Sequence, residues 1–340
     1  MGDFADRLAD ATDQEVKGGD EMEQALGWLD TGNYALNWAV SGRFQRGWPL
    51  GHVVEVFGES GTGKSYLAQR AVKGTQDVGG WAHYDDTEAR LNPDFAEKLG
   101  IDLEDMSKST SHTVEDHFDV MKAYMNLAQQ MYDDGENEGP FLLVLDSLAE
   151  MTTEAELDAE MDTRVQDKPL KIHSLLRQVS TGFSEIPALY FICNRVYDDP
   201  GASPWESARN TPGGKGTNYR STVRLDLRTP KWLKEDGDRT AVRIRAVVDK
   251  NTVTSPWKEA SMVIPFNRPI SPYSGLITKL LELNIIETSG HTVVHKGEDT
   301  GIKAQKSNLL KQEKSSRQLV DEYPDIIEYA DQVLEERENG

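Results

Sequence analysis

The chain has 340 residues, of which 37% are hydrophobic, so it can bury one large core and still form smaller appendages at its ends. Its formal net charge of −21 excludes a generally basic nucleic-acid-binding protein, although a local basic groove is compatible with it. No apolar run approaches the roughly 18 residues of a membrane-spanning helix, and the N-terminus lacks the basic and apolar parts of a secretory signal. The single cysteine, Cys193, lies in an apolar run, which excludes disulfides within the chain and predicts a packed thiol. We therefore expect a cytoplasmic protein that does not contact a membrane.

Strands and helices alternate along the chain from residue 53 onward. The apolar patterns predict a buried strand at 53–57, a helix at 64–77 and a second strand at 81–85. Apolar residues at helical spacing predict an amphipathic helix over 115–132. The same patterns predict further strands at 141–146, 189–193, 223–227, 243–248 and 261–266, and a helix at 170–183. Strands joined by crossover helices predict an α/β fold with a mostly parallel sheet that binds ligands at the carboxyl ends of its strands.

The strongest chemical signal is a glycine-rich loop between the first predicted strand and the helix that follows it. The loop matches the P-loop pattern G-x-x-x-x-G-K-[ST] and consists of Gly58, Glu59, Ser60, Gly61, Thr62, Gly63, Lys64 and Ser65. Backbone amides of such a loop bind phosphate oxygens, Lys64 reaches the β- and γ-phosphates, and Ser65 can ligate Mg²⁺. The loop and the adjoining Tyr66 therefore predict a site for ATP with Mg²⁺.

Two carboxylates are expected to complete this site. Asp146 follows an apolar run, as in a Walker B strand, and is predicted to hold Mg²⁺ through water because Mg²⁺ keeps several of its waters. Hydrolysis also needs a group that orients and deprotonates the attacking water. Glu88 is our candidate for this general base, because it follows the second predicted strand, whose carboxyl end lies beside the P-loop in a parallel sheet. Position alone leaves Asp85 and Asp86 as alternatives.

The segment that contains Glu88 resembles a known family. Residues 86–100, DTEARLNPDFAEKLG, are similar to the part of RecA recombinases that carries the catalytic glutamate and an aromatic residue that stacks on adenine, here Phe95. The likeness continues in order through residues 145–149, 154–157, 211–214, 223–228, 256–258 and 270–276, and covers about residues 30–290 in total. The last of these segments, ISPYSGL, is most similar to the phage-encoded branch often called UvsX.

The resemblance implies a RecA-type P-loop NTPase core at residues 36–270, with a helical N-terminal arm at 1–35 and a small C-terminal region at 271–340. It implies a recombinase that forms filaments on single-stranded DNA and promotes homologous pairing and strand exchange, with DNA-stimulated ATP hydrolysis. Its partners would be single-stranded DNA, homologous duplex DNA and further copies of the chain, with single-strand-binding and loader proteins as further candidates. If the chain is phage-encoded, its compartment is the host cytoplasm.

Two segments resemble the DNA-binding loops of the family, at residues 156–171 and 196–220. Basic and small residues there suit a grip on the backbone of a single strand that tolerates any sequence. The predicted contacts are Arg164, Lys168 and Lys171 in the first loop and Arg209, Gly213, Gly214, Lys215 and Arg220 in the second. Both loops also contain acidic residues, so exposure without DNA contact is the alternative for each of these positions. Trp205 either inserts between bases or packs within its own loop.

Two positions depart from the family. Bacterial RecA has an Asn-Gln pair after its fourth core strand, with a glutamine thought to sense the γ-phosphate, whereas this chain has Asn194 and Arg195. Arg195 would either contact the same phosphate or alter the coupling between ATP and DNA. Of two lysines that the family extends to a neighbouring subunit's nucleotide, Lys250 matches one, while Thr252 stands at the other. A site completed by a neighbour's lysine predicts a head-to-tail helical filament, and Arg195 is a candidate to replace the missing charge.

The residues near each end of the chain have two alternative interpretations. Basic residues at 303–317 precede acidic residues at 321–338, which predicts either a basic lobe screened from DNA by an acidic tail or two solvated helix faces. At the other end, Phe4, Leu26 and Trp28 are candidates to dock on a neighbouring subunit, with packing inside the chain as the alternative.

The P-loop core also leaves two alternative functions. One is a hexameric DNA helicase on the same core, which the glutamate after the second strand also fits, although no primase-like or linker domain is recognisable. The other is a non-catalytic ATP-binding mediator that loads a different recombinase. The intact Lys64, Glu88 and Asp146 count against the mediator.

Overall fold

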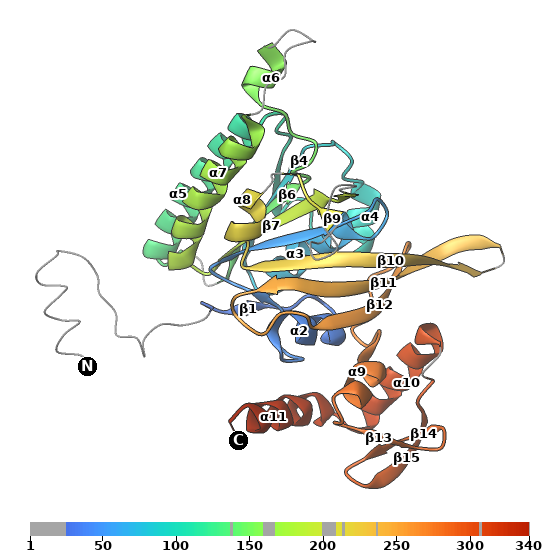
Figure 1. Ribbon diagram of the computed structural model, residues 1–340. Coiled ribbons are helices and arrows are strands. Elements are labelled where there is room, and N and C mark those ends of the chain that lie inside the picture. Colours follow the sequence, from blue (N-terminus) through green and yellow to red (C-terminus); the bar gives the residue numbers. More distant parts are fainter. Residues whose placement is uncertain are drawn as a thin grey trace, which may run out of the picture.

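The centre of the molecule is an eight-stranded sheet with the strand order β12-β11-β10-β3-β7-β6-β4-β5 (Figure 1). The structure, a computed structural model, describes residues 25–136, 139–158, 167–198, 209–212, 215–235, 237–305 and 308–339. The strands of the sheet are β3 (His52–Gly58), β4 (Trp81–Asp86), β5 (Met106–Ser109), β6 (Phe141–Asp146), β7 (Ala188–Arg195), β10 (Val223–Glu235), β11 (Asp238–Asn251) and β12 (Glu259–Pro265). From β10 to β5 the neighbours pair in parallel, whereas β11 and β12 extend the sheet antiparallel. The expected α/β fold with a mostly parallel sheet is therefore confirmed.

Helices cover both faces of this sheet, with α5 and α7 side by side over one of them (Figure 1). The helices of the core are α2 (Tyr34–Ser41), α3 (Lys64–Asp77), α4 (Pro93–Lys98), α5 (Val114–Asp133), α7 (Lys168–Gly182) and α8 (Lys215–Arg220). Leu142 and Val144 of β6 pack in the cluster that α2 and α3 cover. Leu143 and Leu145 of the same strand pack in the cluster that α5 and α7 cover. Burial on both faces explains why this strand is a continuous apolar run in the sequence.

Shorter elements attach to this core. They are β1 (Trp28–Leu29), β2 (Trp48–Pro49), α6 (Glu154–Asp158), η1 (Phe183–Glu185), β8 (Tyr197–Asp198) and β9 (Arg209–Asn210). Strand β1 pairs with β2, and Leu29 packs in the cluster under α3. Trp28 is half-buried within the chain and Leu26 is exposed, while Phe4 lies outside the described residues.

Strands β10 and β11 are much longer than the sequence predicted, and form a ribbon that extends beyond the other strands (Figure 1). Near its start, β10 pairs with both β3 and β11, but from Lys231 onward it pairs with β11 alone. Lys231 and Lys234 of this outer part are exposed. The outer ribbon therefore lacks the continuous apolar run by which a buried strand is recognised.

The C-terminal region forms its own small core. It contains α9 (Leu276–Glu282), β13 (Glu287–Ser289), β14 (Thr292–His295), β15 (Glu298–Lys303), α10 (Leu309–Glu322) and α11 (Ile326–Asn339). Phe44 of the main domain is buried in this core, and Arg43 forms an ion pair of 2.6 Å with Glu338 of α11. The acidic run at 321–338 thus lies largely on a helix that packs on the rest of the protein. Among the described residues, no helix is long and apolar enough to span a membrane.

His295 gives the C-terminal region an expected pH dependence. Its side chain is 3% exposed, neither ring nitrogen has a hydrogen-bond partner in the described residues, and the rings of Tyr323 and Tyr329 pack edge-on against it. Burial, assisted by the charge of Lys296, lowers the pKa of His295 below its ordinary value. The unfolded chain therefore binds a proton that the folded chain does not, and stability falls as the pH drops through about 6.5.

We expect His295→Phe to remove this dependence. Thermal unfolding measured between pH 7.5 and 5.5 should show a smaller loss of stability for the variant, by up to about 1.4 kcal/mol per pH unit. The exposed His291, changed to Gln, is the matched control and should behave as wild type. Identical pH profiles for His295→Phe and wild type would contradict the assignment.

Candidate active site

The P-loop joins the end of β3 to the start of α3, as the sequence predicted. Gly61 and Gly63 adopt φ angles of 76° and 96°, a region that favours glycine, and a Cβ atom at Gly63 would lie 2.5 Å from the side chain of Ile264. The Nζ atom of Lys64 donates hydrogen bonds to the carbonyl oxygens of Gly58 at 3.0 Å and Glu59 at 2.8 Å. The lysine therefore lies over the tip of the loop, where a phosphate group would replace these carbonyls.

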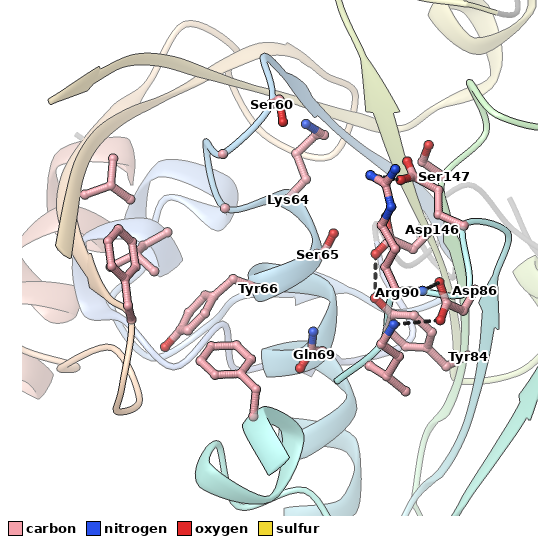
Figure 2. Close-up of a pocket in the computed structure, with 18 of the residues that line it drawn as sticks. Ser60, Lys64, Ser65, Tyr66, Gln69, Tyr84, Asp86, Arg90, Asp146 and Ser147 are labelled. Carbon is pink, nitrogen blue, oxygen red and sulfur yellow. Dashed lines mark hydrogen bonds and ion pairs between the residues drawn. The ribbon is translucent and has the colours of Figure 1, made fainter. Parts of the chain in front are cut away.

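A cavity of about 300 Å³ opens beside this loop (Figure 2). One end is polar, with Lys64, Ser65 and Asp146 facing the same space. The other end is mostly apolar, with one amide, that of Gln69, and is otherwise lined by Tyr66, Leu91, Phe95, Val242, Ile264, Pro265 and Phe266. The ring centroids of Tyr66 and Phe95 lie 6.2 Å apart, and burial raises the pKa of the Tyr66 hydroxyl to about 12. A polar end joined to a flat aromatic end suits a nucleotide, with phosphates at the first and the base at the second.

The residues at the polar end fit a Mg²⁺ ion. Ser65 in the first turn of α3 supplies a hydroxyl, Asp146 at the end of β6 supplies a carboxylate, and both line the cavity. The Tyr84 hydroxyl donates a 2.6 Å hydrogen bond to Oδ2 of Asp146, which orients the carboxylate. The described residues contain no cluster of three or more His, Cys, Asp or Glu side chains, so a metal with a larger protein ligand set is not indicated there. Hard oxygen donors in small number are what Mg²⁺ uses in nucleotide sites.

The structure separates the three carboxylates that were candidates for the general base. Asp85 is buried, accepts a hydrogen bond from the Ser111 amide and contacts His117 at 2.5 Å. Burial raises the pKa of Asp85, but the hydrogen bond and charge of His117 outweigh this and hold it well below its usual range. The carboxylate of Asp86 accepts hydrogen bonds from the backbone amides of residues 90 and 91, at 3.1 and 2.8 Å. Asp86 and Glu88 both line the cavity, but backbone amides hold both oxygens of Asp86, which makes Glu88 the better placed of the two to reach a water beside a phosphate.

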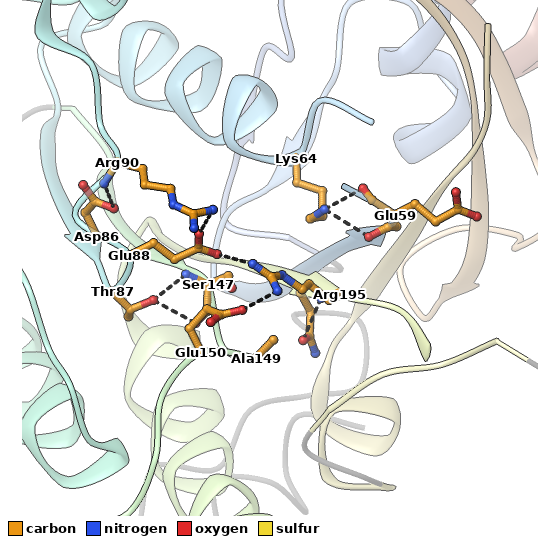
Figure 3. Close-up of polar contacts among 12 residues, drawn as sticks. Glu59, Lys64, Asp86, Thr87, Glu88, Arg90, Ser147, Ala149, Glu150 and Arg195 are labelled. Carbon is orange, nitrogen blue, oxygen red and sulfur yellow. Dashed lines mark hydrogen bonds and ion pairs between the residues drawn. The ribbon is translucent and has the colours of Figure 1, made fainter. Parts of the chain in front are cut away.

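Arginines surround Glu88 (Figure 3). Nη2 of Arg195 lies 2.9 Å from Oε1 of Glu88, and Arg90 forms an ion pair with Oε2. Nη1 of Arg195 lies 2.6 Å from a carboxylate oxygen of Glu150. The neighbouring Asn194 points elsewhere and donates to Glu55 and to the carbonyl oxygen of Pro212, at 2.8 and 2.9 Å. Arg195, at the end of β7, therefore belongs to the nucleotide site, whereas Asn194 links β7 to Pro212 in the second predicted DNA loop.

Comparison with known proteins agrees with this geometry. A family model of the RecA N-terminal domain matches residues 12–271, which include all eight strands of the central sheet. The chain belongs to the RecA family. It is 29% identical to Protein RecA of Enterococcus gallinarum over 287 residues, which covers 84% of this chain and 78% of the relative. It is 30% identical to Protein RecA of Mycobacteroides abscessus over 284 residues (83% and 78%), and 31% identical to that of Mycobacterium avium over 284 residues (83% and 77%).

In this RecA-family chain the expected DNA contacts of the first loop are engaged with protein groups. Lys168, the first residue of α7, donates from Nζ to the carbonyl oxygens of Ala149, at 3.1 Å, and Met151. Lys171 forms ion pairs with Glu115 and Asp167. A DNA phosphate would have to compete with these groups for either ammonium. Arg164 lies outside the described residues.

The second loop is described only in part. Arg209 lies in β9 and Lys215 begins α8, but their side chains, like Gly213, Gly214 and Trp205, lie outside the described part of the structure. Arg220 ends α8 and is half-buried. Lys250, the residue expected to reach a neighbouring subunit, donates from Nζ to the carbonyl oxygens of Asn218 and Tyr219, both at 2.9 Å. It does not line the cavity of its own chain.

Three residues near the cavity carry no motif that sequence reasoning could use. Phe266 follows β12 and lines the apolar end, whereas Arg90 and Glu150 pair with groups around Glu88. For Phe266 the available signal was an aromatic residue at the end of a predicted strand. For Arg90 and Glu150 there was none, because a charged residue in a loop is usually a solvated one.

Proposed function

We propose that this RecA-family protein is an ATP-dependent DNA recombinase that forms filaments on single-stranded DNA and promotes homologous pairing and strand exchange. The observation that carries the proposal is the convergence of Lys64, Glu88 and Asp146 in one cavity, at the carboxyl ends of three parallel strands. These are the residue types that nucleotide hydrolysis needs: a phosphate-binding cation, a base and a metal ligand. The three relatives compared above, each of which covers more than 80% of the chain, are named Protein RecA.

Each residue of the polar end has a role in this proposal. Bound Mg²⁺ would neutralise charge that develops on the β- and γ-phosphates. Ser65 and Asp146 would hold it, the latter through water, while Lys64 turns from the carbonyls of the P-loop to the phosphates. Glu88 orients the attacking water and accepts its proton, which requires one carboxylate oxygen to leave its arginine partner.

The apolar end of the cavity would hold the base of ATP. Phe95 stacks on adenine in this arrangement, and Phe266 and Ile264 line the same cavity. The buried amide oxygen of Gln69, which lines the same end, has no hydrogen-bond partner in the described residues. The amino group of adenine is a donor that suits it.

The proposal extends to assembly and to the arrangement of the chain. Lys250 lies outside its own cavity, so it would act on the nucleotide of a neighbouring subunit in a head-to-tail filament. We propose the arm at 1–35 as an oligomerisation segment, the regions 156–171 and 196–220 as DNA loops, and 271–340 as a separate C-terminal region, which has its own core. Membership of the phage-encoded branch rests on residues 270–276 and stays a prediction.

ATP hydrolysis with and without single-stranded DNA tests the function. We expect DNA to raise the turnover rate and added salt to weaken the stimulation steeply, because the contacts are mainly to phosphates. Homologous strand exchange without unwinding of a duplex would then exclude the hexameric helicase. Turnover that does not respond to DNA, or no turnover at all, would contradict the proposal, and the latter would favour the non-catalytic mediator.

A further inference from the structure

Glu150 lies outside the nucleotide cavity but is linked to its general base candidate by a single side chain. Arg195 spans the two carboxylates, with Nη1 2.6 Å from Glu150 and Nη2 2.9 Å from Glu88 (Figure 3). Both oxygens of Glu88 have partners, because Arg90 pairs with the second one. In this arrangement Glu88 is not free to accept a proton from water.

The segment that carries Glu150 is attached to the first DNA loop. Nζ of Lys168 donates to the carbonyl oxygens of the two residues that flank Glu150, Ala149 and Met151. Burial lowers the pKa of Lys168, and the carboxylates of Glu156 and Glu150 act in the opposite direction. Lys168 lies within the segment predicted to bind DNA, residues 156–171. A continuous set of contacts therefore runs from this loop through Glu150 and Arg195 to Glu88.

We propose that Glu150 is a positioning residue that holds Arg195 on Glu88 while DNA is absent, and that a DNA phosphate bound at Lys168 releases it. A DNA phosphate that captures Lys168 removes the donor from the carbonyls on either side of Glu150. The Glu150 segment then shifts, and Arg195 leaves Glu88 for the γ-phosphate, which frees one oxygen of the base. This inference rests on the proposed DNA-stimulated hydrolysis of ATP.

The size of the effect follows from the ion pairs that Arg195 must give up. Leaving the observed position breaks two pairs, one to Glu88 and one to Glu150. The side chains of Arg195 and Glu150 are 44% and 35% exposed, so solvent screens their pair and keeps its contribution modest. Removal of the Glu150 charge lowers the free energy that Arg195 needs to leave Glu88 by the contribution of one such ion pair. This corresponds to about a fivefold change in the population in which Arg195 has left Glu88.

The test is the rate of ATP hydrolysis by Glu150→Gln, with and without single-stranded DNA. We expect the DNA-free kcat to rise about fivefold, the KM for ATP to stay the same, and the DNA stimulation ratio to fall by the same factor. Glu150→Asp keeps the charge and should restore part of the low DNA-free rate. The exposed Glu287 of β13, changed to Gln, is the matched control and should leave both rates unchanged.

Each other outcome has a defined meaning. If wild type is stimulated by DNA and Glu150→Gln has the same two rates, the role of Glu150 is wrong and the proposed function stands. If Glu150→Gln raises the DNA-free rate but Lys168→Gln does not, the link from Lys168 to Glu150 is wrong. If wild type hydrolyses no ATP under either condition, both the inference and the proposed function are overturned. Thermal unfolding of each variant verifies that it is folded.

Discussion

Lys64→Ala is expected to lower the rate of ATP hydrolysis by about 100- to 1,000-fold, the loss seen when one preorganised donor to a developing negative charge is removed. Lys64 is the cation at the tip of the P-loop, and its Nζ atom already sits on the carbonyl oxygens of Gly58 and Glu59, where phosphate oxygens would bind. The truncation removes the positive charge without filling the space. Steady-state hydrolysis at saturating ATP, with single-stranded DNA present, measures the effect.

Lys73→Ala is the control for this experiment, because Lys73 lies on the same helix and its ion pair within the described residues is with Asp77 near the surface. A surface pair contributes little, so hydrolysis should stay within about twofold of wild type. Lys64→Ala with a rate near that of the control would show that the P-loop does not bind the phosphates of the hydrolysed nucleotide.

Most of the fold followed from local patterns in the sequence. Strand β6 was predictable because both of its faces are buried, which makes Phe141–Asp146 a continuous apolar run that ends in a carboxylate. Helix α3 was predictable to the residue because glycines precede and follow it. The outer part of β10 was not, because from Lys231 onward it pairs with β11 on one side alone and exposed charges interrupt its apolar pattern.

The candidate site divides in the same way. Lys64, Ser65 and Asp146 belong to local motifs whose spacing already places them together in a parallel sheet. The contact of Arg195 with Glu150 joins β7 to the segment after β6, and no local pattern connects these two residues. The sequence suggested that Arg195 contacts a phosphate. It did not predict the ion pair of Arg195 with Glu88, because no local pattern connects these two residues either.

Glu88→Gln is expected to lower the rate of ATP hydrolysis by about 100- to 10,000-fold, the range for loss of a general base, while ATP binding is retained. The amide keeps the shape of the side chain but cannot accept a proton from water. Asp85 and Asp86 are poor replacements, because the first is buried against His117 and the second accepts two backbone amides. Single-turnover hydrolysis and binding of a fluorescent ATP analogue measure the two properties separately.

Glu97→Gln is the matched control. Glu97 is exposed on α4, so this variant carries the same substitution at a position outside the cavity. Loss of binding together with hydrolysis in Glu88→Gln would assign Glu88 to the structure of the site, through its ion pairs with Arg90 and Arg195, and not to proton transfer. Retained binding with near wild-type hydrolysis would place the base elsewhere, with Asp86 as the next candidate. If Glu88 is the general base, the Glu88→Gln variant should still bind ATP but should no longer hydrolyse it. Only the chemical step needs a carboxylate oxygen of Glu88 that has left its arginine partner.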